Sequence, residues 1–336
     1  MNNESKKLAH KAKMGAIWLS LVISILLTLI KFWAYYLTHS TAILTDALES
    51  IVNIIASAFA LFSLNYANKH KDEDHPYGHG KMEYFSAGFE GGLILIAGIL
   101  IIYHASIHLV QGHRVTAIDS GILFTSITTI ILFILAWYVS RIGRRHHSLA
   151  VQAEGKHFLS DAVTNIGLMI SFILIRFTGQ HWIDSVIAIV YSLYIIYMGY
   201  KLIREAMDGL LDKMDFETVE QIVLVLNENR NIDWIDIHNM RLQKFGDSWH
   251  VDCHVTLPYY KDLASTHNEM EKIAEVLNKN FHNRVEFFIH PDPCKPSACG
   301  ICQIDNCDKR SSAFAGKLEW KMENILKNQA HSLEAN

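Results

Sequence analysis

The stretch HFLSDAVTNIGLMISFILIRFT, residues 157–178, decides how the rest of the chain is interpreted. It is long and apolar enough to cross about 30 Å of hydrocarbon as a helix, yet it contains His157 and Asp161. An ionisable side chain at bilayer depth costs about 2.5–3.5 kcal/mol on insertion scales and usually marks a functional site. The four-residue spacing places both side chains on one helix face.

A second apolar stretch carries a polar pair, Glu49 and Asn53, with the same spacing. Two helices that each present two ligands can close a tetrahedral cage around a divalent metal ion. Asp46 lies one turn before Glu49 and is a further candidate ligand, although a helix N-terminal or packing role is the alternative. The sequence therefore predicts an intramembrane metal site formed by Glu49, Asn53, His157 and Asp161.

The composition is that of a membrane protein with a polar appendage. Half of the residues are hydrophobic, 19% are charged, and the mean hydropathy is +0.15. Each long apolar stretch exceeds the roughly 18 residues that a spanning helix needs. We predict an α-helical membrane domain over residues 1–211, with six spans near 14–37, 41–66, 84–110, 117–140, 157–178 and 183–207.

The distribution of basic residues predicts the orientation. They gather before the first span and in the loops 67–83 and 141–156, so the positive-inside rule places these loops and both termini in the cytoplasm. The expected location is the cytoplasmic (inner) membrane, with the lipid bilayer as a partner. The net charge of −4 and the lack of a basic, aromatic-interleaved patch argue against nucleic acid as a partner.

From residue 212 the pattern becomes that of a soluble domain. A helix is expected over 216–227, and two strands, 232–245 and 248–257, meet at a hairpin at 246–247. A second helix over 263–278 and a strand over 284–290 follow. The order αββαβ predicts a small α+β domain over 212–293, with the helices on one face of the sheet.

Two further groups of residues are candidate metal ligands. In the cytoplasmic loop, Asp72, His75 and His79 can approach one cation, with glycines allowing a tight turn; a solvated loop is the alternative. In the soluble domain, metal-competent side chains come from different elements, and the alternative is that each histidine is structural. These residues are His238, His254, His267, His290 and Asp292.

All five cysteines follow the last span, as suits a reducing cytoplasm. Cys253 is expected to pack in the core of its strand. The other four form a C-x4-C-x2-C-x4-C cluster in the tail, residues 294–336, which indicates a zinc knuckle, an iron–sulfur site or free thiols. This cluster consists of Cys294, Cys299, Cys302 and Cys307. Beyond Ser311 the tail is expected to form a short amphipathic helix.

The role of one acidic residue in the predicted membrane domain, Glu90, does not follow from any motif in the sequence. Glu90 lies on the third span between Gly88 and Gly92, a small-x-x-x-small pair that lets helices approach closely. It could form a packing hydrogen bond or a contact between two copies of the chain, and both interpretations stay open.

Four motifs together resemble the cation diffusion facilitator family. They are STAILTDALESIVN at 40–53, HPYGHGKME at 75–83, HFLSDAVTN at 157–165 and IHPDPC at 289–294. The resemblance runs from about residue 10 to residue 295 in the family's order. It implies a homodimeric exporter that exchanges cytoplasmic divalent transition metals for protons and carries a ferredoxin-like (metallochaperone-like) C-terminal domain.

Carried over to this chain, the resemblance implies a transport site at the four intramembrane residues, a loop site at Asp72, His75 and His79, and a regulatory site in the soluble domain. One departure concerns the second span, where the family has two aspartates or a histidine and an aspartate. Here the positions hold Glu49 and Asn53. One imidazole with several oxygens suits Zn(II) best but also tolerates Mn(II), Fe(II) or Co(II).

A membrane-bound metal sensor or scaffold without transport is the alternative function. It would account for the cytoplasmic ligands but would not need His157 and Asp161 at bilayer depth. An enzyme is not expected, because the sequence contains no nucleophile–base pairing, phosphate loop or HExxH motif.

Overall fold

The computed structural model describes residues 3–38, 41–112, 118–245, 248–281 and 285–332. Within the helices, the side chains of residues 3–6, 34–35, 37–38, 41–49, 52, 118–121 and 123–124 are not described. The chain divides into two compact units on either side of the step from Leu211 to Asp212, and each is described by itself.

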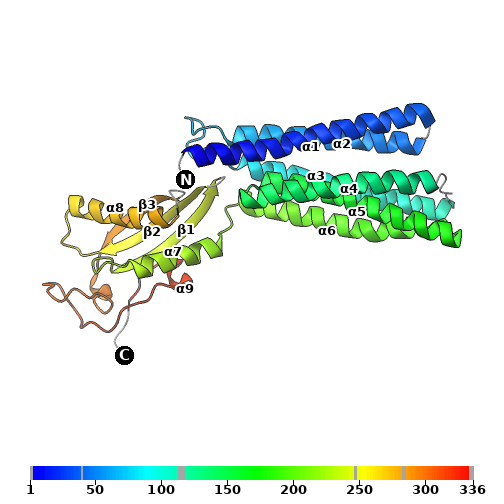
Figure 1. The fold of residues 1–336 in the computed structure, drawn as a ribbon. Helices are drawn as coiled ribbons and strands as arrows, with labels where there is room; N and C mark the ends of the chain where they lie inside the picture. The colour runs from blue at the N-terminus through cyan, green and yellow to red at the C-terminus, as the bar shows by residue number, and fades with distance from the viewer. Residues whose placement is uncertain (1–2, 39–40, 113–117, 246–247, 282–284, 333–336) are drawn as a thin grey trace. The chain divides into compact units, whose positions relative to one another are not determined.

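The first unit is a bundle of long helices (Figure 1). They are α1 (Asn3–Thr38), α2 (Thr41–Ala67), α3 (Met82–Gln111), α4 (Ile118–Arg145), α5 (Leu149–Thr178) and α6 (Trp182–Leu210). Five of them contain described stretches that are long and apolar enough to cross a membrane, and α2 adds the apolar stretch Asn53–Ala67. The predicted helical membrane domain is confirmed.

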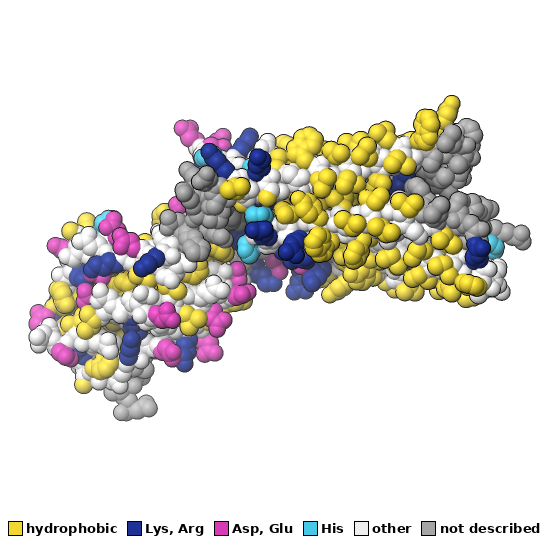
Figure 2. Space-filling model, viewed as in Figure 1, with side chains coloured by type: hydrophobic (Ala, Val, Ile, Leu, Met, Phe, Trp, Pro, Cys, Tyr) yellow, Lys and Arg dark blue, Asp and Glu magenta, His cyan; other side chains and the backbone are white. Residues whose placement is uncertain are grey.

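Large apolar side chains are exposed on the surface of this unit, and small and polar side chains are among those buried inside it. On the face that Figure 2 shows, hydrophobic side chains cover much of the helices. Leu100, Tyr103 and Tyr197, for example, are each at least half exposed. Ser57 and Ser192 are buried. Small residues between helices and large apolar ones outside are typical of a bundle that faces lipid.

Backbone contact between α3 and α6 is centred on Gly91 and Gly199. A Cβ atom on Gly199 would lie 2.7 Å from the backbone nitrogen of Leu95 and 2.9 Å from the carbonyl oxygen of Gly91. Of the pair that the sequence indicated, Gly88 lies at this interface, because a Cβ atom there would be 3.3 Å from the Cβ atom of Ala206 on α6. Gly92 does not, since a Cβ atom there would meet no atom within 4 Å.

The second unit is an α+β domain, as predicted. Its sheet has the order β1–β2–β3, in which β1 and β2 are antiparallel and β2 and β3 are parallel. The N-caps Asp215 and Asp262 start its two longer helices by accepting backbone hydrogen bonds from Thr218 and Ser265. The elements are α7 (Phe216–Glu228), β1 (Asp236–Phe245), β2 (Ser248–Leu257), α8 (Leu263–Asn280) and β3 (Val285–Pro293).

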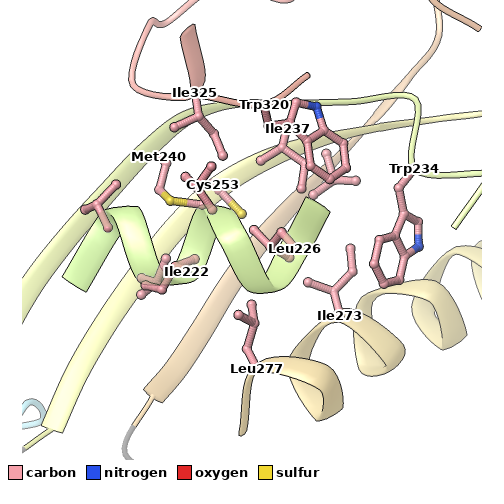
Figure 3. Close-up of a cluster of buried hydrophobic side chains, with 14 of the residues drawn as sticks. Ile222, Leu226, Trp234, Ile237, Met240, Cys253, Ile273, Leu277, Trp320 and Ile325 are labelled. Atoms are coloured by element: carbon pink, nitrogen blue, oxygen red, sulfur yellow. The ribbon is translucent and has the colours of Figure 1, made fainter. Parts of the chain in front are cut away.

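The core of this domain lies between the sheet and its helices (Figure 3). Cys253 is 2% exposed, so its predicted packing role is confirmed, and burial raises the pKa of its thiol to about 12. The tail differs from its prediction. In its described part, the region beyond Ser311 is helical only in α9 (Met322–Ile325). The rest of this region is largely irregular, and Trp320 and Ile325 pack into the core of the domain.

Candidate metal sites

The first candidate site lies inside the helical unit, where α2 and α5 face each other. Nε2 of His157 lies 3.0 Å from Oδ1 of Asn53 and 3.9 Å from Oδ2 of Asp161. The amide nitrogen of Asn53 donates to Oδ2 of Asp161 at 2.8 Å. Three of the four residues that the sequence pairs by spacing thus meet from two helices. His157 is 6% exposed, and the Asp161 side chain is 30% exposed.

The chemistry of this group suits a divalent cation. It offers one imidazole nitrogen, one amide oxygen and one carboxylate, which are ligands that Zn(II) and neighbouring transition metals accept. The candidates Asp46 and Glu49 also lie on α2, but their side chains are outside the described residues. Glu49 precedes Asn53 by one helical turn, so the backbone puts it on the same helix face.

The second candidate site is in the loop between α2 and α3. Nδ1 of His75 lies 3.0 Å from Oδ1 of Asp72, and Nε2 of His79 lies 3.4 Å from Oδ2. One ligand atom from each residue lies within 4.8 Å of the others. Desolvation acts to raise the pKa of Asp72, but hydrogen bonds from the backbone and ring of His75 and the nearby His79 lower it below its ordinary value.

The third candidate site is a row of histidines across the sheet of the soluble domain. The strand register places His238 opposite His254 and His254 opposite His290. Oδ2 of Asp292 lies 2.9 Å from Nδ1 of His254 and 3.6 Å from Nε2 of His238, and Oδ1 lies 3.2 Å from Nδ1 of His290. His238, His254 and Asp292 bring ligand atoms within 4.8 Å of one another.

His267, predicted to belong to this site, is not part of that group in the described structure. It projects from α8, 71% exposed, and its Nε2 lies 3.4 Å from Glu271. The reason is topological, because α8 covers one face of the sheet whereas the histidine row alternates with the core residues of β2.

Sequence reasoning missed two residues behind His238. Asp236 is fully buried, with Oδ2 3.5 Å from Nδ1 of His238. His331 of the tail donates its backbone N–H to Asp236, and its Nδ1 lies 2.8 Å from the same carboxylate. Burial acts to raise the pKa of Asp236, but its hydrogen bonds to His238 and His331 lower it to about 2. A carboxylate behind a ligating histidine fixes its orientation; no spacing pattern pointed to His331.

The cysteine cluster occupies the loop that follows β3. Burial raises the pKa of the Cys294 thiol, although a hydrogen bond from the Tyr259 backbone acts to lower it. The nearby thiols of Cys302, Cys307 and Cys299 raise it further. Arg310 donates to the carbonyl oxygens of Cys299 and Cys302 at 3.2 and 3.0 Å, which folds the loop around the thiols. Among the described residues, no three thiols lie within 4.8 Å of one another.

Another missed residue adjoins the membrane site. Glu154 lies one turn before His157 on α5, is fully buried, and accepts a hydrogen bond from Ser57. The predicted span began at residue 157, whereas α5 begins at Leu149. An ionisable residue inside a longer predicted helix would have been the signal.

Together these features define a multi-pass membrane protein with a metal-competent polar site inside its helical unit and a soluble α+β domain. Residues 17–211 match the cation efflux transmembrane domain, and residues 212–294 match the cytoplasmic domain of cation efflux proteins. The chain belongs to the cation diffusion facilitator family of cation efflux transporters.

Relatives extend along most of the chain. An uncharacterized transporter from Synechocystis sp. is 29% identical over 280 residues, which cover 80% of this chain and 90% of the relative. The cation-efflux pump FieF of Citrobacter koseri is 26% identical over 295 residues, covering 88% of this chain and 96% of the pump. The same pump from Escherichia coli matches with the same identity and coverage.

Proposed function

We propose that this chain exports a divalent transition-metal cation from the cytoplasm in exchange for protons. The observation that carries the proposal is the meeting of Asn53, His157 and Asp161 from two helices inside an apolar bundle. Hydrocarbon-facing helices do not keep an imidazole and a carboxylate together without a function for them. Membership of a cation efflux family supports efflux as the direction.

Protons would compete with metal for this site. Metal binding needs a neutral His157 and an ionised Asp161, because the proton and the metal use the same lone pairs. In an outward-facing state, protonation of these groups would release the metal, and the protonated form would return. Alternating access would come from rocking of the helices that carry the site against the others.

The metal is proposed to be Zn(II), with Fe(II), Mn(II) and Co(II) as alternatives. The described donors are one nitrogen and two oxygen-bearing groups, and Glu49 would complete a four-ligand cage on the same face of α2. Asp46, one helical turn before Glu49, is proposed as an auxiliary carboxylate ligand. Borderline metals accept such a mixed set, and geometry and availability select among them.

The cytoplasmic residues are proposed to bind the same kind of ion for regulation. The imidazoles and the carboxylate of the sheet site fit a resident divalent metal, since His238, His254 and Asp292 already bring one ligand atom each within 4.8 Å of the others. His290, whose Nδ1 lies 3.2 Å from Oδ1 of Asp292, would extend this set. The remaining proposed site is in the loop between α2 and α3. There one divalent ion would be bound by three ligands, Asp72, His75 and His79.

We further propose that the chain is a homodimer in the inner membrane, with both termini in the cytoplasm. The match of residues 212–294 to the cytoplasmic domain of cation efflux proteins supports this arrangement, because the resemblance to this family implies a homodimer. The basic residues of the loops 67–83 and 141–156 support a cytoplasmic position for these loops and for the soluble domain.

The direct test is transport by the purified protein in liposomes. We expect protein-dependent uptake of zinc that is accompanied by proton movement in the opposite direction. Competition by manganese, iron, cobalt and cadmium would rank the substrates. Metal binding without any uptake would instead support the alternative function, a membrane-bound sensor or scaffold.

The cysteine cluster is proposed to hold one zinc ion as a small knuckle, with an iron–sulfur cluster or free thiols as the alternatives. Metal analysis of the purified chain is expected to show that replacing Cys299 and Cys302 together with serine removes about one equivalent of zinc. Cys253→Ala changes a thiol outside the cluster and should leave that equivalent in place. Equal zinc contents in the double variant and the unchanged protein would contradict the proposal.

A further inference from the structure

Two buried carboxyl groups in the helical unit are not used by the proposed transport site. Glu90 on α3 and Glu154 on α5 are both fully buried, and their carboxyl groups lie within hydrogen-bonding reach of each other. Ser57 on α2 donates its hydroxyl hydrogen to Oε1 of Glu154. Apart from this mutual approach of the two carboxyl groups, no N–H or O–H group of the described residues donates to either oxygen of Glu90 or to Oε2 of Glu154.

Among the described groups that act on this pair, only His157 can carry a positive charge, and metal binding at the proposed transport site requires it to be neutral. The titratable groups that act on Glu154 are Glu90, His157 and Asp161, and Glu90 is acted on by Glu154. Two ionised carboxylates side by side in an apolar interior lose their hydration and repel each other. The pair is therefore expected to keep one proton, shared in a hydrogen bond between the two side chains.

Several charged groups of the neighbouring helices have partners of their own. Lys156 of α5 lies 2.6 Å from Glu205 of α6, and Lys13 of α1 lies 2.8 Å from Glu83 of α3. On α6, Asp184 accepts a hydrogen bond from Ser171. On α4, the described charged residues lie only in its final turns, at Arg141, Arg144 and Arg145.

Glu154 and its hydrogen-bond donor Ser57 lie beside the proposed transport site on the two helices that form it, α5 and α2. Glu154 precedes His157 by three residues on α5, and Ser57 follows Asn53 by four residues on α2. These steps correspond to about 4.5 and 6 Å along a helix axis. A divalent ion held by Asn53, His157 and Asp161 would therefore bring its charge to within about one turn of the pair and favour loss of the shared proton.

We propose that Glu90 and Glu154 form a second proton-binding site, which holds one shared proton when the transport site lacks metal and releases it when a divalent cation binds there. The proton leaves as a free cation, and the pair changes from one negative charge to two. The inference rests on the proposed metal–proton exchange and adds specific carriers for part of the proton flux.

Transport stoichiometry tests the assignment. In liposomes, Glu90→Gln and Glu154→Gln should each lower the number of protons exchanged per zinc ion, by about one, while zinc uptake stays above that of protein-free vesicles. Glu205→Gln changes a carboxylate outside the pair and should keep the original ratio. An unchanged ratio in both pair variants would overturn the proposal. Absence of zinc uptake by the unsubstituted protein would instead overturn the proposed function.

Infrared difference spectroscopy provides a readout that does not depend on transport. Adding Zn(II) to the purified, unsubstituted protein should remove the absorption of a protonated carboxyl group. This loss should be absent in Glu90→Gln and Glu154→Gln and present in Glu205→Gln. If both pair variants still lose a carboxyl band of the original size, the proton is held elsewhere and the assignment is wrong.

Discussion

Replacing Asp161 with alanine is expected to reduce zinc-driven proton flux in liposomes to that of vesicles without protein. Asp161 is the one described carboxylate of the transport group, and its Oδ2 accepts from Asn53 and faces Nε2 of His157. Removing it leaves an imidazole, a neutral amide and the proposed Glu49 ligand, whose single negative charge does not balance a divalent ion in a low-dielectric interior. Loss of an outer-shell partner alone typically costs about 10–100-fold in metal affinity, so loss of a ligand should cost more.

Two further variants separate charge from packing. Asp161→Asn keeps the size of the side chain and should be nearly as defective as the alanine variant if negative charge is what the ion requires. Glu205→Gln neutralises a half-buried carboxylate that pairs with Lys156 outside the group, and it should transport at close to the original rate. Flux at the unsubstituted level in Asp161→Ala would show that the ion does not bind at this site.

Most of the fold could be predicted from local patterns in the sequence. The long apolar helices follow from hydropathy, and the soluble domain follows from the period-two alternation of Val251, Cys253 and Val255 with polar residues. Helix ends were less accurate, because the sequence signal for a span is its apolar centre. The polar first turns of α5, from Leu149, were therefore left outside the predicted segment.

The meeting of Asn53, His157 and Asp161 was predictable because their spacing is that of a helix face. The sheet site was only partly predictable, since the meeting of His238, His254 and His290 depends on strand register. Contacts across long sequence separations gave no local signal. Glu90 and Glu154 are brought together by packing between α3 and α5, and His331 reaches Asp236 from the tail.

The tail, too, makes contacts across a long sequence separation that no local pattern indicates. Trp320 is 1% exposed in the core of the soluble domain, with the Arg230 guanidinium 3.9 Å from the centre of its ring. Asn227 ties the same residue to α7 by donating to its carbonyl oxygen at 2.7 Å. The segment lies beyond residue 294, where the match to the cytoplasmic domain family ends. The tail is thus a structural part of this domain rather than an appendage.

Trp320→Ala should destabilise the soluble domain by about 3–5 kcal/mol, the usual cost of deleting a buried aromatic side chain. The loss includes its packing against Ile237 and the cover that it gives to Arg230, whose pKa burial lowers to about 10. Hydrogen exchange of the full chain should show faster exchange throughout β1 and β2, because core strands exchange by global opening of their unit. Phe314→Ala removes an aromatic ring that is 43% exposed in the same tail and should change exchange little. Equal protection in the Trp320 variant and the unchanged protein would mean that the tail does not contribute to this core.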